Sequence, residues 1–257
     1  MGFVTGKKAL VLGIANERSL AYAIGRRLVA EGAQLAVTYQ GEVFEDRVRK
    51  LADSLGDPLL VSCDVTRDED IERTVAAVGR ELGGIDMLVH AIAYADKEDL
   101  VGPYYTVSRP GFLKAMEIGA YSFTAVARAA LPLMEGRGGG SMLTLTYFGA
   151  EKVIQHYNVM GVTKAALEAS VRYLANDFGH LGVRVNALSA GPIKTLSAKG
   201  VSDFNSMLAH SREKAPLQRN VTGEDIGAAG LFLLSDLSSG VTGEVLHVDC
   251  GYSIIGM

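Results

Sequence analysis

Seven short apolar segments, separated by segments with helical periodicity, constrain the fold more than any other feature of this 257-residue sequence. Short strands that alternate with helices of about 10–15 residues are typical of βαβ units and of a parallel sheet. Right-handed crossovers then place helices on both faces of that sheet. The expected strands are residues 8–12, 34–39, 59–63, 86–90, 141–146, 182–188 and 244–248.

The segments between these strands predict the helices. The helix expected over residues 109–133 should break near Gly119, and Thr66 is expected to cap the helix that follows it. No change of composition marks a linker, so the sequence predicts one doubly wound, Rossmann-type domain over residues 1–257. The other expected helices are residues 20–31, 41–55, 67–82, 157–178, 202–212 and 224–234.

Charge and composition exclude several classes of protein. The net charge is −4 and there is no arginine-rich run, which argues against a nucleic-acid partner. No window approaches about 18 consecutive apolar residues, so no membrane-spanning helix is expected. Cys63 and Cys250 lie far apart in apolar runs, which favours buried, reduced thiols over a disulfide. We therefore expect a cytoplasmic protein with no metal site.

The first expected strand leads into the first helix through a glycine turn. Gly13 follows the strand directly, and Ser19 stands at the start of the helix. A helix N-terminus offers N–H groups and a partial positive charge to a pyrophosphate. The usual G-x-G-x-x-G pattern is missing, so an ordinary strand-to-helix turn would explain these residues equally well. Their position in a doubly wound pattern is what favours a dinucleotide.

Two further segments bear on the cofactor. The second strand is followed by Gln40, which is neither the acid that binds a ribose nor part of a basic cluster for a 2′-phosphate. Acidic residues come next, so NADH is favoured over NADPH. Asp64 and Val65 follow the third strand, where an aspartate can accept a hydrogen bond from adenine. An N-terminal cap for the next helix is the alternative for Asp64.

Tyr157 and Lys164 are seven residues apart on one expected helix, so their side chains share a face. An ammonium near a phenol favours the phenolate and predicts a lowered pKa for Tyr157 if the two are close and partly desolvated. This pair alone leaves an alternative open, in which the lysine lies on the surface, the tyrosine lies at an interface, and the two side chains never meet.

With a dinucleotide turn and a Tyr–Lys helix in one chain, the sequence resembles the short-chain dehydrogenase/reductase superfamily. It departs from the common pattern, in which the lysine comes four residues after the tyrosine, because that position is Gly161 here. The usual catalytic serine near the end of the preceding strand is also replaced, since that strand ends in Thr144-Leu145-Thr146-Tyr147.

With these departures, the sequence resembles one branch of the superfamily, the NADH-dependent enoyl-acyl carrier protein reductases of bacterial type II fatty acid synthesis. The resemblance covers essentially the whole chain. Its most specific parts are the spacing Tyr147-x9-Tyr157-x6-Lys164 and the later segment SAGPIKT. Ala91 stands where this branch often has Ser, and Gln155 where it often has Pro.

The resemblance implies that a trans-2-enoyl thioester on acyl carrier protein is reduced by NADH. Tyr157 would hydrogen-bond the thioester oxygen, Lys164 would hold the nicotinamide ribose, and Tyr147 would orient the thioester unless it is a core residue. Ala95 would also meet the substrate. The implied cofactor-binding residues are Gly13, Ser19, Leu20, Gln40, Asp64, Val65, Ile92, Lys164, Ile193, Lys194, Thr195, Leu196 and Ser197.

A substrate-binding loop and lid are implied over residues 193–215. Phe204, Met207 and Leu208 have helical spacing there and would either cover an acyl crevice or pack onto the core. Nearby cations would meet the acidic acyl carrier protein or simply be solvated. The resemblance also implies a homotetramer, with residues 109–133 and 157–178 as interface elements.

Two other functions compete with this one. A carbonyl or alcohol reductase of the same superfamily would keep the fold, but the displaced lysine and the position of Tyr147 weigh against it. A noncatalytic dinucleotide sensor would need only the cofactor site. Retention of Tyr147, Tyr157 and Lys164 together argues against a sensor.

Overall fold

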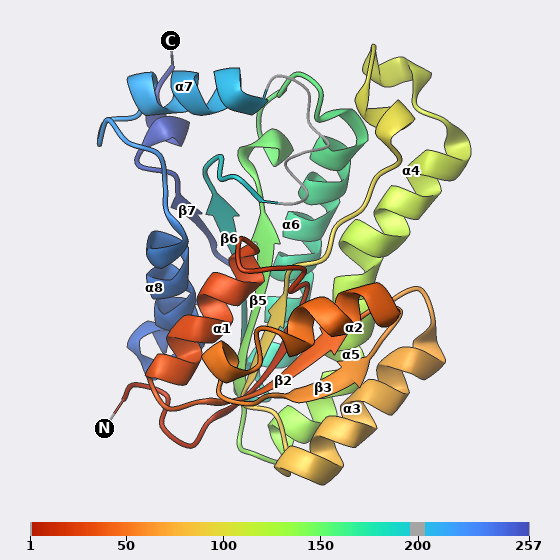
Figure 1. Ribbon diagram of the computed structural model, residues 1–257, viewed down its shortest axis with the longest axis vertical. Helices are drawn as coiled ribbons and strands as arrows, with labels where there is room; N and C mark the ends of the chain where they lie inside the picture. The colour runs from red at the N-terminus through yellow and green to blue at the C-terminus, as the bar shows by residue number, and fades with distance from the viewer. Residues whose placement is uncertain (1, 196–203, 257) are drawn as a thin grey trace.

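The computed structural model describes residues 2–195 and 204–256, and a parallel sheet runs through its centre (Figure 1). The strand order is β3-β2-β1-β4-β5-β6-β7, with every neighbouring pair parallel. The predicted doubly wound fold with seven parallel strands is therefore confirmed. The strands are β1 (Lys8–Leu12), β2 (Gln34–Tyr39), β3 (Leu59–Ser62), β4 (Met87–His90), β5 (Gly140–Thr146), β6 (Val183–Ala190) and β7 (Val245–Val248).

Helices cover both faces of the sheet, because its strands alternate buried apolar side chains between two hydrophobic layers. In β1, for example, Val11 points into one layer and Leu10 into the other. The layer that contains Val11 is closed by α1 (Leu20–Ala30), α2 (Glu42–Arg49) and α8 (Gly223–Leu234). The opposite layer is closed by α3 (Asp68–Leu82), α5 (Ser122–Glu135) and α6 (Asn158–Gly179).

The carboxyl edge of the sheet is where a ligand is expected. The strand order reverses between β1 and β4, and open α/β sheets bind ligands at such a switch point. In Figure 1, α7 (Phe204–Lys214) lies across this edge, above β6 and β7. A helix from late in the sequence therefore covers part of the carboxyl edge of the sheet.

The helix expected over residues 109–133 breaks as predicted. α4 (Arg109–Met116) passes through a π-helical segment, Glu117–Tyr121, into α5. Gly119 lies in that segment, where an added Cβ would lie 2.6 Å from Cγ2 of Thr163 on α6. The break thus coincides with a close approach to α6 that leaves little room for a side chain.

Two local predictions were wrong. The helix expected over residues 41–55 ends at Arg49 and is followed by a separate 3₁₀ turn, Asp53–Leu55, which buries Leu55 against α1. Thr66 does not cap α3, because its hydroxyl donates to Oδ1 of Asp64 at 2.7 Å. Asp64 does not cap α3 either: its carboxylate accepts from the Thr66 hydroxyl and backbone N–H in a local turn.

Cys63 and Cys250 are buried free thiols, as predicted. None of the helices formed by the described residues has the length and apolar character that crossing a membrane requires.

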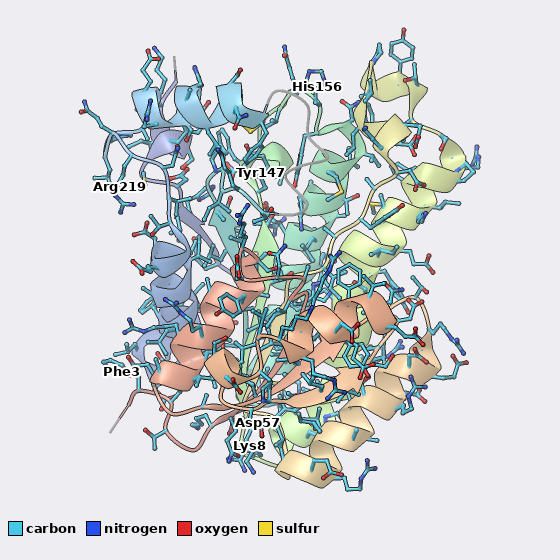
Figure 2. The ribbon with its side chains drawn as sticks, in the orientation of Figure 1. Phe3, Lys8, Asp57, Tyr147, His156 and Arg219 are labelled. Atoms are coloured by element: carbon cyan, nitrogen blue, oxygen red, sulfur yellow. The ribbon has the colours of Figure 1, made fainter. Side chains whose placement is uncertain are left out.

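We expect Asp86→Ala to lower the free energy of unfolding by about 3 kcal/mol, because it leaves a backbone donor and a guanidinium without their anion. Asp86 lies at the edge of the sheet opposite the ligand edge. Its carboxylate accepts from the Lys8 N–H at 2.8 Å and from Nε of Arg137 at 2.8 Å, and it is only 5% exposed. Figure 2 shows Lys8 at this edge and Tyr147 at the other.

Urea unfolding checks this expectation. Asp86→Asn, which keeps an acceptor oxygen but removes the charge, should lose about half as much stability. The exposed Asp53 provides a control, and Asp53→Ala should change stability by less than about 0.5 kcal/mol. Equal stability of Asp86→Ala and the wild-type protein would contradict the role given to this carboxylate.

Candidate active site

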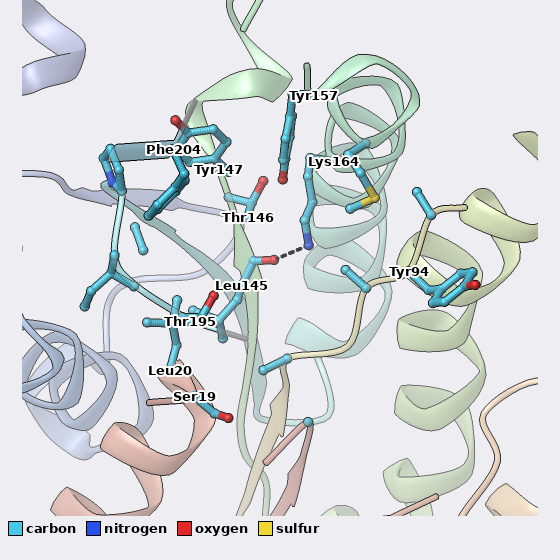
Figure 3. A pocket seen from close by; sticks show the side chains of 18 of the residues that line it. Ser19, Leu20, Tyr94, Leu145, Thr146, Tyr147, Tyr157, Lys164, Thr195 and Phe204 are labelled. Atoms are coloured by element: carbon cyan, nitrogen blue, oxygen red, sulfur yellow. Dashed lines mark hydrogen bonds between the residues drawn. The ribbon is translucent and has the colours of Figure 1, made fainter. Parts of the chain in front are cut away.

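A pocket of about 430 Å³ lies at the carboxyl edge of the sheet (Figure 3). One wall is the turn after β1, and the opposite wall is formed by the end of β5 and the start of α6. The loops after β4 and β6 close its sides. Phe204 and Met207 reach it from α7. Segments far apart in the sequence therefore meet where the fold predicts a ligand.

The pocket gathers many of the residues singled out from the sequence. Those that line it are Gly13, Ser19, Leu20, Ala95, Tyr147, Tyr157, Lys164, Ile193 and Thr195. The lining does not include Gln40, Asp64, Val65, Ile92 or Lys194. Leu196 and Ser197 lie outside the described residues. Gln40 and Asp64 follow β2 and β3 at the same edge of the sheet, so only an elongated ligand can reach both them and the pocket.

The glycine turn after β1 packs closely against the backbone that follows β4. Gly13 has φ +101°, and an added Cβ would lie 2.2 Å from the carbonyl oxygen of Ala91. Oγ of Ser19 accepts from the N–H groups of Ala15 and Asn16 at 3.0 and 3.1 Å. α1 has no side-chain cap and no acidic residue in its first turn, so no carboxylate there competes with a bound anion.

Tyr157 is held at the start of α6, where it is the N-cap residue. The residues on either side, His156 and Asn158, both have left-handed backbone conformations, with φ of 62° and 33°. The Asn158 side chain donates to the carbonyl oxygen of Gly102 at 3.0 Å, which fixes this turn to the loop after β4. The Tyr157 ring packs edge-on against Tyr147, with ring centroids 5.0 Å apart.

The predicted lowering of the Tyr157 pKa was wrong. Burial raises the pKa of Tyr157 well above the ordinary value, and the neighbouring Tyr147 and Glu168 raise it further. Burial likewise raises the pKa of Tyr147 to about 12. Both side chains are therefore neutral phenols at physiological pH, able to donate a hydrogen bond.

Lys164 lies in the same pocket, so the pair is not a surface lysine and a distant tyrosine. Its Nζ donates to the carbonyl oxygen of Leu145 at 2.7 Å, the dashed line in Figure 3. Figure 3 also shows the Tyr157 hydroxyl and the Lys164 ammonium directed into the same part of the pocket. Burial lowers the pKa of Lys164 to about 8, against an opposing effect of Glu168.

The lowered pKa of Lys164 makes stability depend on pH. An unfolded lysine has a pKa near 10.5, so burying the charge costs stability below about pH 8 and costs progressively less as pH rises to about 10.5. We expect the wild-type protein to gain about 3 kcal/mol from this group over that range. Urea unfolding at several pH values should show the gain, and Lys164→Met should lack it. The same rise in the variant would contradict this assignment.

Two glycines explain why the lysine comes seven residues after the tyrosine. An added Cβ on Gly161 would lie 2.7 Å from the carbonyl oxygen of Gly149, so α6 approaches the turn after β5 too closely for a lysine there. An added Cβ on Gly149 would lie 2.5 Å from Cδ1 of Tyr157. The position that carries lysine in most of the superfamily is thus occupied by a backbone contact that supports the Tyr157 ring.

We expect Gly149→Ala to lower kcat at least about tenfold, because the new methyl group must displace the Tyr157 ring. NADH affinity should change by less than about twofold, since Lys164 is not touched. Gly179→Ala is a matched control, because nothing lies within 4 Å of the added Cβ. Steady-state kinetics and NADH titration measure both effects. Wild-type turnover in Gly149→Ala would show that this contact does not position Tyr157.

Other expected substrate contacts divide between the pocket and the surrounding structure. Tyr147 lines the pocket and its hydroxyl lies 3.3 Å from Sδ of Met207 on α7, so it is not a core residue. Of the three helical residues expected in a lid, Phe204 and Met207 line the pocket, whereas Leu208 is buried. Tyr94 also lines it, although its hydroxyl turns away in Figure 3.

The sequence interpretation missed several polar residues behind the pocket. His90 at the end of β4 is fully buried, with Nε2 2.8 Å from Oγ of Ser122. Burial and the charge of Lys164 lower the pKa of His90 to about 3, so this histidine is neutral. Glu168, four residues after Lys164 on α6, was also missed. Its i, i+4 spacing from Lys164 was the available signal.

Comparisons with known proteins agree with this geometry. A family model described as enoyl-(acyl carrier protein) reductase matches residues 13–253. An NADH-dependent enoyl-acyl carrier protein reductase of Rhizobium meliloti is 53% identical over 256 residues, covering 100% of this chain and 93% of that protein. The crystal structure of the reductase from Anaplasma phagocytophilum in complex with NAD has a TM-score of 0.96 and 51% identity, and the match covers 100% of this chain and 97% of that one.

A second solved structure extends the match over both full chains. It is the enoyl-acyl carrier protein reductase of Bacillus cereus with NADP+ and an indole naphthyridinone, with a TM-score of 0.97, 52% identity and 100% coverage of each chain. Sequence identity of this extent and the shared fold confirm the resemblance inferred from the sequence. The chain belongs to the enoyl-acyl carrier protein reductase family.

Proposed function

We propose that this chain reduces the trans-2 double bond of enoyl thioesters carried by acyl carrier protein, with NADH as the reductant. The observation that carries the proposal is the meeting of Tyr157 and Lys164 in a buried pocket at the carboxyl edge of the sheet, in a chain of this family. NADH is the cofactor of the related reductase from Rhizobium meliloti, as its name states.

The residues at the glycine turn fit a dinucleotide. The start of α1, which has no side-chain cap and no acidic residue in its first turn, suits a pyrophosphate. Ser19 and Leu20 would line this end, Lys164 would hold the nicotinamide ribose, and Ile193 and Thr195 would meet the carboxamide from the loop after β6. When bound, NADH supplies the hydride that reduces the double bond.

Tyr157 would act on the substrate as a hydrogen-bond donor. Its raised pKa keeps the proton on the phenol at neutral pH, so the hydroxyl can donate to the thioester oxygen as negative charge develops there. A donor that strengthens its bond as the charge grows lowers the barrier. The Lys164 ammonium adds positive charge to the same part of the pocket, and Tyr147 packs against the Tyr157 ring and would help orient the thioester.

Apolar side chains would receive the acyl chain. Leu100 and Met160 belong to a small hydrophobic cluster that includes Ala95 and the Tyr157 ring, and both line the pocket. Phe204 and Met207 face the pocket from α7 and would cover it within the proposed lid of residues 193–215. A crevice bounded in this way excludes water from the reacting thioester.

The adenosine end is proposed to prefer NADH. Gln40 is exposed after β2, and the first turn of α2 carries Glu42 and Glu45. These carboxylates would repel a 2′-phosphate. Asp64 stays a candidate for adenine, since hydrogen bonds from Thr66 and Gln40 overcome the effect of burial and lower its pKa. The Bacillus cereus relative was crystallised with NADP+, so the preference needs a direct test.

The proposed partners are acyl carrier protein and further copies of this chain. Lys194 and Arg212 are exposed, on the loop after β6 and on α7, two segments that also supply pocket residues, and they would face the acidic carrier. Leu113, Tyr121 and Tyr173 are large exposed apolar side chains on the helices expected at the interface of a homotetramer. Light scattering of the purified protein tests the tetramer. The proposed location is the cytoplasm.

The direct test is NADH oxidation, followed by the loss of near-ultraviolet absorbance, with a medium-chain trans-2-enoyl thioester and with NADPH in parallel. Fast oxidation of NADH with slow oxidation of NADPH is the expected result. Reduction of a ketone with no turnover of the thioester would indicate a carbonyl reductase instead. NADH binding with no turnover of either substrate would indicate a dinucleotide sensor.

A further inference from the structure

Two side chains of α6 form hydrogen bonds with two consecutive residues at the end of β5. Lys164 donates to the carbonyl oxygen of Leu145 at 2.7 Å, and Oε1 of Glu168 accepts from the Thr146 hydroxyl at 2.6 Å. Lys164 and Glu168 lie one helical turn apart and are only 6% and 8% exposed. Leu145, Thr146 and Lys164 line the pocket and Tyr147 follows β5 directly, so this double attachment forms part of the pocket wall.

We propose that Glu168 is a positioning residue of the active site, which fixes the end of β5 through Thr146 and supplies the negative charge that keeps the buried Lys164 in its ammonium form. Glu168 does not line the pocket, so it acts through these two neighbours. The inference rests on the proposed role of Lys164 in holding NADH.

The charged surroundings of Lys164 support this assignment. Burial disfavours its ammonium form, and among the described residues Glu168 is the acidic group that opposes this effect. The other titratable groups that face Lys164 are His90 from β4 and Tyr157 at the start of α6, and both are neutral at physiological pH. Within residues 2–195 and 204–256, Glu168 therefore carries the one charge that compensates this ammonium.

Glu168 has neighbours of its own from three elements. Glu151 follows β5, His247 lies on β7, and Arg172 lies one turn further along α6. The pKa of Glu168 is raised from its ordinary value, chiefly by burial and further by Glu151, although the Thr146 hydrogen bond, His247 and Arg172 oppose this shift. Glu151 is already paired with His247, at 2.7 Å between Oε1 and Nε2. Glu151 is a control acid, because it belongs to this cluster but is not among the groups that act on Lys164.

The test is the NADH dissociation constant as a function of pH, measured by NADH fluorescence on the full-length protein between about pH 6.5 and 9.5. The wild-type protein should lose affinity as Lys164 loses its proton near pH 8. Glu168→Gln keeps an oxygen for Thr146 but removes the charge, so this loss should move down by about one pH unit. NADH binding should then weaken by about eightfold at pH 8.5 and by only about 1.3-fold at pH 6.5.

Two matched variants separate charge from hydrogen bonding. Thr146→Val removes the hydroxyl and leaves the Glu168 carboxylate, so the pH dependence should stay in place while kcat falls severalfold. Glu151→Gln removes the neighbouring exposed charge and should leave both the pH dependence and kcat close to wild type. Circular dichroism checks folding, and Glu168→Met, with a side chain of similar length, replaces Glu168→Gln if the latter does not fold.

The outcomes distinguish this inference from the proposed function. An NADH affinity that shows no loss at alkaline pH in the wild-type protein and is unaffected by Lys164→Ala would overturn the role of Lys164 itself. If the wild-type protein and Lys164→Ala behave as expected but Glu168→Gln titrates at the wild-type pH, Glu168 does not maintain the ammonium. An equal shift in Glu151→Gln would also overturn the assignment, because any nearby acid would then have the same effect.

Discussion

Tyr157→Phe should lower kcat by about two orders of magnitude while changing NADH affinity by less than about twofold. The substitution removes one hydroxyl and keeps the ring that packs against Tyr147. A donor aimed at developing negative charge contributes about 10²–10³-fold to kcat when it is removed from comparable sites. The cofactor contacts proposed for Lys164 and the glycine turn stay intact, so binding and turnover should separate.

Single-turnover and steady-state kinetics with an enoyl thioester measure this effect, and titration with NADH measures affinity. Tyr105→Phe is the matched control, since Tyr105 is 86% exposed and does not line the pocket. It should behave as wild type. Turnover of Tyr157→Phe at the wild-type rate would remove Tyr157 from the mechanism. A large loss of NADH affinity would mean that Tyr157 acts on the cofactor.

Lys164→Ala should instead weaken NADH binding by about 30–100-fold at pH 7. The ammonium is buried, and charge-assisted hydrogen bonds to a bound ligand contribute about 2–3 kcal/mol each in such surroundings. The substitution also removes the bond from Nζ to Leu145, so the end of β5 loses one of its two attachments to α6. We therefore expect a smaller fall in kcat at saturating NADH.

Lys164→Arg separates charge from shape. It restores the positive charge, but a planar guanidinium should not reproduce the geometry of the ammonium's bond to Leu145. Partial recovery of NADH affinity is the expected result, measured by the same titration. Unchanged NADH affinity in Lys164→Ala would rule out the ribose-holding role, whatever its effect on turnover.

The outline of the fold follows from local patterns that the sequence carries. The β2 strand was predicted at its observed limits, because an apolar run bounded by polar residues and glycine reports its own ends. The region after β2 was not: helical periodicity suggested residues 41–55, but the chain leaves α2 at Arg49 so that Leu55 can pack under α1. Burial against another element outweighed local periodicity there.

The glycine turn and the polar residues after β3 also separate what the sequence predicts from what contacts in the folded chain decide. Gly13 was recognised as a turn, but the clash that excludes a side chain involves Ala91, which is 78 residues away along the chain. Asp64 and Thr66 were both read as candidate caps because such residues often cap helices. In the structure they bond to each other, which leaves α3 without a side-chain cap.

The sequence by itself determined the strand–helix alternation, the shared helix face of Tyr157 and Lys164, and the family, because these depend on residue types at fixed spacings. Only the tertiary structure decided the protonation of that pair. Burial by side chains from other elements raises the pKa of Tyr157 and lowers the pKa of Lys164. The attraction between an ammonium and a phenolate, taken alone, would have lowered the pKa of Tyr157. It also brought Glu168 to Thr146 across 22 residues of sequence. Spacing along a helix reports which side chains share a face, whereas desolvation depends on every atom that the rest of the chain packs around them.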